Sequence, residues 1–148
     1  MIPENEYRIV IKSVPIICVD VILEHPEKGY LLVRRNNEPL KDDYWVVGGR
    51  VLKSETLKDA AIRKVRQELG FTTKNLDFVG VYEDFFDKNS LQLDSLYHTV
   101  SAVFHAALQN QDDFQLDSQS SSWMFSDKLP ARLKILTSEK SLTKKAGL

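Results

Sequence analysis

Two carboxylates of the 148-residue chain stand where the sequence is otherwise apolar. Asp20 interrupts the apolar run 14–23, and Glu68 lies at the margin of the apolar side of a segment with helical periodicity. Burying a carboxylate is costly unless it accepts hydrogen bonds or pairs with a cation. Both positions are therefore candidate functional residues. The structural alternatives are a strand end or edge for Asp20 and an ion pair with Lys64, four residues earlier, for Glu68.

The segment 56–69 must position Glu68, and both of its ends carry helix signals. Thr56 can cap the first turn, Asp59 lies within that turn, and Gly70 follows the last residue. At about 100° per residue, several apolar side chains fall on one side of this segment: Leu57, Ala61, Ile62, Val65 and Leu69. The sequence therefore predicts an amphipathic helix with Glu68 beside its buried side.

The other apolar segments are rich in β-branched or aromatic residues and predict strands. These segments are 14–23, 30–33, 44–47, 76–82, 97–108 and 123–125. Residues 87–94 and 109–122 are polar and predict loops, and a helix is an option from Ser126 onward. Strands before and after one well-capped helix indicate a mixed α/β domain.

Composition excludes several classes of protein. Twenty Lys and Arg against 21 Asp and Glu give a net charge of −1, which leaves no surplus of positive charge for a general nucleic-acid binder. No stretch approaches the ~20 apolar residues that cross a bilayer, and residues 1–6 lack the features of a signal peptide. The single cysteine, Cys18, lies in the apolar run 14–23 and predicts a core residue rather than redox chemistry. We expect one domain over residues 1–148, cytoplasmic, with no nucleic acid or membrane as partner.

Around the predicted helix, a spaced set of residues resembles the Nudix box, a loop–helix motif with which the Nudix family holds a divalent metal against a diphosphate. The stretch reads Gly49-x5-Glu55-x7-Arg63. The family pattern is matched in type and spacing at Gly49, Glu55, Arg63, Val65, Gly70 and Phe71. The resemblance implies the Nudix fold, an α/β/α sandwich with a mixed central sheet. Without the resemblance, Glu55 and Arg63 are explained as a salt bridge that ties the loop to the helix.

Of the three helical metal-binding glutamates of the Nudix box, only Glu68 is kept. Lys64 and Gln67 replace the other two, and Lys64 brings a positive charge where the typical enzyme has a carboxylate. A reduced box of this kind is similar to that of the GDP-mannose mannosyl hydrolase branch of the family. Further landmarks of that branch are Pro15, Asn37, Pro39, Gly48, Val51, Gly80, Val81, Phe85, Asp87, His98 and Asp117.

In that branch, water attacks the anomeric carbon of the sugar and releases free sugar and a nucleoside diphosphate. The resemblance implies Mg²⁺, or Mn²⁺, held by the Gly49 carbonyl and the side chains of Glu68 and Gln119. It also implies a homodimer. The residues implied to bind substrate are Asp20, Arg35, Arg50 and Arg63. Arg35 would also neutralise charge on the departing diphosphate, for which guanidinium groups are well suited.

The general base is where the chain departs from that branch. Ser120 stands in place of the catalytic histidine, directly after Gln119, and a serine hydroxyl needs an activating base of its own. His98, Asp84 and Glu83 are the alternatives, although a strand histidine such as His98 is more often structural. Aromatic residues near the polar loop are candidates to line a nucleobase pocket: Tyr82, Phe85 and Phe86.

Three functions remain open at this point. The first is Mg²⁺-dependent hydrolysis of a nucleotide sugar, of the GDP-mannose or GDP-glucose type, at the anomeric carbon. The second is attack at phosphorus in a nucleoside diphosphate derivative, with carboxylates such as Glu83 and Asp84 supplied from outside the box. The third is a nucleotide-sugar-binding module without catalysis, which the missing histidine and glutamates would explain.

Overall fold

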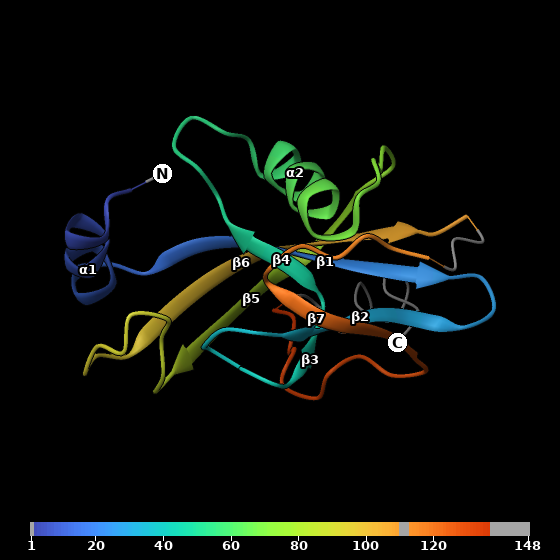
Figure 1. The fold of residues 1–148 in the computed structure, drawn as a ribbon. Helices are drawn as coiled ribbons and strands as arrows, with labels where there is room; N and C mark the ends of the chain where they lie inside the picture. The colour runs from blue at the N-terminus through green and yellow to red at the C-terminus, as the bar shows by residue number, and fades with distance from the viewer. Residues whose placement is uncertain (1, 110–112, 137–148) are drawn as a thin grey trace.

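The structure, a computed structural model, describes residues 2–109 and 113–136 (Figure 1). Its elements in chain order are α1 (Glu4–Ser13), β1 (Ile16–His25), β2 (Gly29–Arg35), β3 (Tyr44–Trp45), β4 (Val47–Arg50), α2 (Leu57–Leu69), β5 (Asp77–Phe86), β6 (Tyr97–Ala107) and β7 (Ser120–Ser126). The predicted mixed α/β class is confirmed. None of the helices in the described part of the chain has the length and apolar character that a membrane span requires.

The sheet is mixed and is organised around β1. Its main order is β3-β2-β1-β6-β5, with β4 paired to β1 and β7 paired to β2. β1 and β6 are parallel, and the other pairs are antiparallel. Beside β1, the strand β2 pairs only at the far end, from Glu24 onward, whereas β4 pairs with residues 18–21. This arrangement brings the glycines of the box against the middle of β1.

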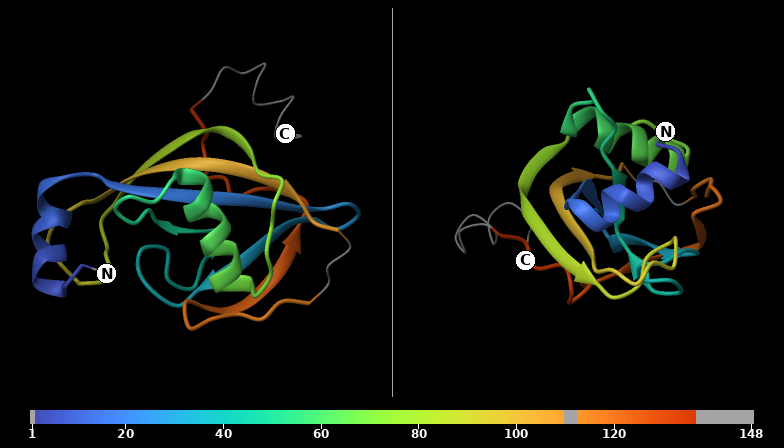
Figure 2. Two further views of the ribbon diagram at one scale, coloured as in Figure 1. Left: turned by 90° about the horizontal axis from the view of Figure 1, so that it is seen from above. Right: turned by 90° about the vertical axis from the view of Figure 1, so that its left-hand side faces the viewer.

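The helix α2 begins and ends where the sequence predicts. The Thr56 side chain accepts a hydrogen bond from the Asp59 backbone N–H at 3.0 Å, and Gly70 ends the helix in the left-handed conformation, at φ 78°. Figure 2 shows α2 lying over one face of a strongly curved sheet. Its side chains Ala61, Val65 and Leu69 are buried in the main apolar core with residues of β1, β2 and β6. Packing of this stripe fixes the neighbouring Glu68 at the edge of the core.

The helix α1 was not predicted from the sequence. It lies at one end of the molecule, away from α2 (Figures 1 and 2). Tyr7 and Ile11, one turn apart, are buried in a small apolar cluster with Cys18 and Tyr97. Burial raises the pKa of the Cys18 thiol to about 12, which agrees with its predicted place in the core.

The segment after β7 differs from the sequence prediction. Residues 127–136 form turns and one isolated bridge between Val81 and Leu136, so the helix considered from Ser126 onward is not found among the described residues. The basic positions Lys140, Lys144 and Lys145 lie outside the described residues. In addition, β7 begins at Ser120, within the polar run that predicted a loop.

Candidate active site

A cavity of about 510 Å³ lies beside the box, among α1, β1, β4, β6 and α2. Cavities of this size hold small-molecule ligands. The sequence-derived candidates that line it are Asp20, Arg35, Gly49, Arg50, Arg63 and Gln119. Its lining therefore joins residues of both helices, of the strands β1 to β6 and of the segments that connect them.

Lys64 is buried in this site although it carries a charge. Its side chain is 6% exposed, and its Nζ lies 3.0 Å from Oε1 of Glu68. The same ammonium donates to Oε1 of Gln119 at 3.4 Å. A Cβ atom at Gly49 would come within 2.5 Å of the Lys64 Cε and 3.0 Å of its Nζ, so the glycine leaves the space that the lysine fills. Lys64 thus touches Glu68, Gln119 and Gly49.

Glu68 is 5% exposed at its side chain, and burial raises its pKa despite the opposing charge of Lys64. Arg35 also acts on this carboxylate in the direction of a lower pKa. Glu68 is therefore held by neighbouring cations rather than by water.

Asp20 is the second buried carboxylate of the site. Its Oδ1 accepts a hydrogen bond from Trp45 Nε1 at 3.1 Å, and Ser101 is a further side-chain hydrogen-bond partner. Burial raises the pKa of Asp20 above its ordinary value of 3.8, against the lowering effect of these bonds and of Arg35. Asp20 lies opposite Gly48 in the pairing of β1 with β4 and lines the cavity. Its place is therefore interior and not at a strand end.

Arg63 is fully engaged in holding the box together. Its Nε and Nη2 donate to the two carboxylate oxygens of Glu55, at 2.6 and 3.0 Å. Its Nη2 also donates to the Arg50 carbonyl at 2.9 Å, and its Nη1 donates to Gln67 at 3.1 Å. The hydrogen bond from Arg63 lowers the pKa of Glu55. This geometry favours a structural role for Arg63, as the residues alone indicated.

Arg35 and Arg50 bring two more cations to the cavity. The Nε of Arg35 donates to the Pro39 carbonyl at 2.8 Å, which orients its guanidinium from the end of β2. The guanidinium of Arg50 lies 4.2 Å from the centre of the Tyr7 ring, a cation–π distance. Tyr7 comes from α1, which the sequence analysis did not assign, although its i,i+4 spacing with Ile11 after Pro3 is a helix signal.

Aromatic side chains form the rest of the cavity wall. The Tyr7 and Tyr97 hydroxyls lie 3.0 Å apart, and the Trp45 and Tyr82 rings are 5.8 Å apart. Phe86 also lines the cavity, whereas Phe85 does not belong to its lining. The cavity lining thus contains both cationic side chains and aromatic rings.

The sequence-derived candidates for the general base lie outside the lining of this cavity. The His98 ring stacks on Phe85 at 4.3 Å. Ser120 is buried in β7 opposite Arg35, and Glu83 is exposed. Asp84 is bound by Arg132 and Tyr82; these bonds outweigh burial and lower its pKa.

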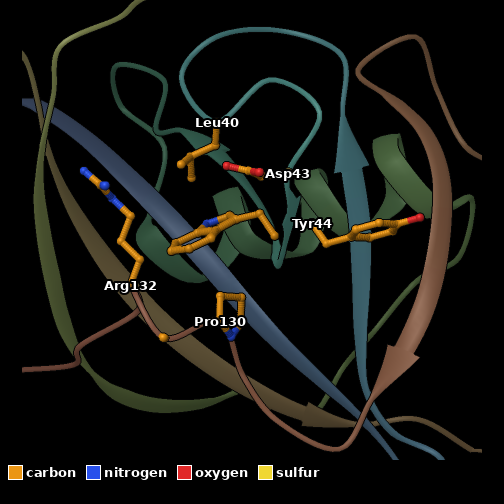
Figure 3. A pocket seen from close by; sticks show the side chains of 7 residues that line it. Leu40, Asp43, Tyr44, Pro130 and Arg132 are labelled. Carbon is orange, nitrogen blue, oxygen red and sulfur yellow. The ribbon is translucent and has the colours of Figure 1, made fainter.

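A second, smaller hollow of about 290 Å³ is also lined by Trp45 (Figure 3). Leu40 and Asp43 from the loop after β2 face Pro130 and Arg132 from the segment after β7. Its lining contains no residue of the stretch 49–71. We therefore place the candidate active site in the larger cavity.

The fold, the box and the cavity define a Nudix domain. A model of the NUDIX domain matches residues 14–144, and the chain belongs to the Nudix hydrolase family.

Its relatives include the low-salt glycan biosynthesis protein Agl8 of Haloferax volcanii, 34% identical over 120 residues, which are 81% of this chain and 76% of the relative. An ADP-ribose pyrophosphatase of Methanocaldococcus jannaschii is 33% identical over 100 residues. That match covers 68% of this chain and 54% of the relative, so it spans about half the length of the pyrophosphatase. Among solved structures, the MutT protein of Methanosarcina mazei Go1 has a TM-score of 0.65 at 23% identity, over 81% of this chain and 88% of that one. This likeness shows the fold.

Nudix hydrolases generally use divalent metals such as Mg²⁺. Two of the expected ligands, Glu68 and Gln119, converge on the Lys64 ammonium, and the same side chain fills the space beside Gly49. The lysine ammonium offers only hydrogen-bond donors, so it supplies no ligand to a metal ion and holds the oxygens that the ion would need. As arranged, these residues do not fit a divalent metal ion.

Proposed function

We propose that this protein hydrolyses a nucleotide sugar, of the GDP-mannose or GDP-glucose type, to a nucleoside diphosphate and a free sugar. The observation that carries the proposal is the combination, in one cavity of about 510 Å³, of cationic side chains and aromatic rings. A nucleotide sugar has both of the matching parts, since its diphosphate is anionic and its base has stacking faces.

The cationic side chains support binding of the diphosphate. Arg35, Arg50 and Lys64 all line the cavity, and they come from β2, β4 and α2. Guanidinium and ammonium groups form charge-assisted hydrogen bonds with phosphate oxygens. They stabilise a leaving group most where its charge grows in the transition state. These three residues therefore favour departure of the diphosphate as a unit.

Other residues of the lining support binding of the sugar and the base. Asp20 is a buried acceptor at the cavity wall and can accept hydrogen bonds from sugar hydroxyls. Tyr82 and Tyr97 offer ring faces and edges to a nucleobase. The name of the Haloferax relative, a glycan biosynthesis protein, also favours a sugar-containing substrate.

In the proposed reaction, the oxygen of water bonds to the anomeric carbon while the bond from that carbon to the diphosphate breaks. The electron pair of the broken bond leaves with the diphosphate, and the water loses a proton. Asp20 and Glu38 are the carboxylates of the cavity lining. We assign the proton to Glu38, because Asp20 accepts side-chain hydrogen bonds from Trp45 and Ser101, whereas the backbone N–H of Lys41 reaches Oε2 of Glu38 only at 3.4 Å. No step is routed through Mg²⁺ at Gly49, Glu68 and Gln119, since Lys64 lies among these residues.

A second candidate function is attack at phosphorus, which the relative named as an ADP-ribose pyrophosphatase favours. It would give a nucleoside monophosphate and a sugar phosphate. The carboxylates expected for this reaction, Glu83 and Asp84, lie outside the cavity lining, and Asp84 is bound by Arg132. We therefore rank this reaction second.

Phosphorus NMR in ¹⁸O-enriched water separates these functions. The protein is incubated with GDP-mannose, GDP-glucose or ADP-ribose, once with Mg²⁺ and once with EDTA. We expect GDP without ¹⁸O and a labelled free sugar. A monophosphate carrying ¹⁸O would mean attack at phosphorus, and Mg²⁺-independent binding without turnover would favour a binding module. The Arg35→Gln variant, purified identically, must lose the activity, which excludes a contaminating hydrolase. Light scattering on the same sample tests the homodimer implied by the resemblance.

A further inference from the structure

Lys64 occupies the point at which two of the predicted metal ligands, Glu68 and Gln119, meet. Its Nζ is 3.0 Å from the Glu68 carboxylate and 3.4 Å from the Gln119 amide oxygen. The space above Gly49 is filled by the last two carbons and the nitrogen of the same side chain. The oxygen atoms that a divalent ion would bind are therefore already occupied by an ammonium group.

The charge of the Lys64 ammonium prevents a divalent cation from binding at the same place. Glu68 and Lys64 are 5% and 6% exposed at their side chains, so each charge is balanced mainly by the other. A divalent cation bound to Glu68 would lie beside an ammonium in a poorly solvated place, where like charges repel strongly. Mg²⁺ also needs several oxygen ligands at about 2.1 Å, and Lys64 supplies none. Either the ammonium or the divalent ion can use Glu68, but not both together.

The ammonium is also placed to meet a ligand. Lys64 lines the same cavity as Arg35 and Arg50, so it is accessible to an anion inside the protein although it is shielded from bulk water. Glu68 and Gln119 fix its direction, because they accept from its nitrogen from two sides. The third N–H of an ammonium held in this way remains available for an anion in the cavity.

We propose that the Lys64 ammonium takes the place of the divalent cation in this chain and binds the diphosphate directly, so that ligand binding requires no metal ion. The proposal rests on the proposed function only for the identity of the anion. In turnover, the electron pair of the broken carbon–oxygen bond leaves with the diphosphate, and Lys64 keeps its protons while it hydrogen-bonds the leaving oxygens. The water proton passes to Glu38 as described above.

The first test is a Mn²⁺ titration of the nucleotide-free protein, followed by the EPR signal of free Mn²⁺. We expect the wild-type protein to leave this signal at the level of buffer. Lys64→Glu removes the ammonium and places a second carboxylate in the box, where the typical Nudix enzyme has one. This variant should therefore bind Mn²⁺ stoichiometrically. Lys58→Glu is the matched control, because Lys58 is an exposed lysine of the same helix.

The second test is calorimetric titration with GDP, which is the proposed product and is not turned over. We expect the wild-type affinity to differ by less than about threefold between Mg²⁺ and EDTA buffers, whereas Lys64→Met weakens it by about tenfold or more in EDTA. Lys58→Met should leave it unchanged.

Stoichiometric Mn²⁺ binding by the wild-type protein that Glu68→Gln abolishes would overturn the proposal, as would loss of wild-type GDP binding in EDTA. Both measurements use the wild-type protein, so they decide the proposal even where Lys64→Met does not fold. Failure of GDP to bind in either buffer would instead contradict the proposed function, and the Mn²⁺ titration would still decide whether the ammonium excludes the divalent ion.

Discussion

Gly48 of β4 lies directly opposite Asp20 of β1, and its lack of a side chain is what lets the buried carboxylate approach. A Cβ atom at Gly48 would clash with the Val19 carbonyl and come within 2.6 Å of Oδ1 of Asp20. At Gly49, the atom nearest to a new Cβ is Cε of Lys64, in a flexible side chain. The two consecutive glycines therefore make room for different groups.

We expect Gly48→Ala to be much more destabilising than Gly49→Ala. The obstacles at Gly48 are backbone and a buried carboxylate, so the free energy of unfolding should fall by about 3 kcal/mol, against less than about 1 kcal/mol at Gly49. Urea unfolding of the two variants measures both values. Equal losses would contradict the explanation.

Asp20→Asn tests the burial of that carboxylate through the pH dependence of stability. The folded-state pKa of Asp20 is raised above 3.8, so the folded protein binds a proton that the unfolded chain has already released. Its contribution to stability is complete below that value and is lost as pH rises through the folded pKa. The asparagine variant has no such loss, so it should gain stability relative to wild type as pH rises, by about 1.4 kcal/mol per unit of pKa shift. The check is urea unfolding of both proteins from about pH 4 to about pH 7; a constant difference would argue against a buried titrating group.

Arg35→Gln should reduce kcat by about 100-fold, because a cation that stabilises the leaving diphosphate is lost. The neighbouring Arg34 is the matched control: it is exposed, and its Nη2 lies 3.5 Å from Asp42 on the surface. Arg34→Gln should keep kcat within about twofold of wild type. Steady-state kinetics with the substrate found by NMR compares them. A similar loss of kcat in both variants would mean that Arg35 contributes only its positive charge and not a specific contact with the diphosphate.

Much of the fold follows from local signals in the sequence. The caps and the apolar period of residues 56–69 predict α2 almost to the residue, since both signals are local. Tertiary contacts explain the misses. The helix α1 packs through Tyr7 against Tyr97, ninety positions away, and the serines at 120–122 become a strand because β2 pairs with them.

The sequence predicted which residues belong to the candidate site better than it predicted how these residues are arranged. Asp20 was identified because it is out of place in an apolar run, and it does line the cavity. Sequence spacing shows that Lys64 and Glu68 are one helical turn apart. It cannot show that Gln119, in the loop before β7, contacts Lys64. Likewise, His98 and Phe85 are adjacent only through the pairing of β5 with β6.

Glu55 and Arg63 should behave as one structural unit. Their two hydrogen bonds, at 2.6 and 3.0 Å, are partly buried, with side chains 14% and 24% exposed. In a double-mutant cycle of Glu55→Gln and Arg63→Gln, we expect a coupling energy of about 1 kcal/mol or more. The lowered pKa of Glu55 means that this coupling should weaken as pH falls below the ordinary glutamate range. Additive effects of the two substitutions on urea unfolding would contradict a structural pair.

Removal of one charge of the buried pair Lys64–Glu68 should reduce the free energy of unfolding more than removal of both charges. Lys64→Met leaves an uncompensated carboxylate in the core edge and should lower the free energy of unfolding by about 3 kcal/mol or more. The double variant Lys64→Met/Glu68→Leu removes both charges and should recover most of that loss. The exposed pair of Arg8 and Glu4 in α1, at 2.7 Å, has the same i,i+4 spacing, and its removal should change stability by less than about 1 kcal/mol. Urea unfolding of all of these variants is the measurement, and nucleotide binding should not return with stability in the double variant. If Lys64→Met were as stable as wild type, the two charges would have to be solvated rather than buried together.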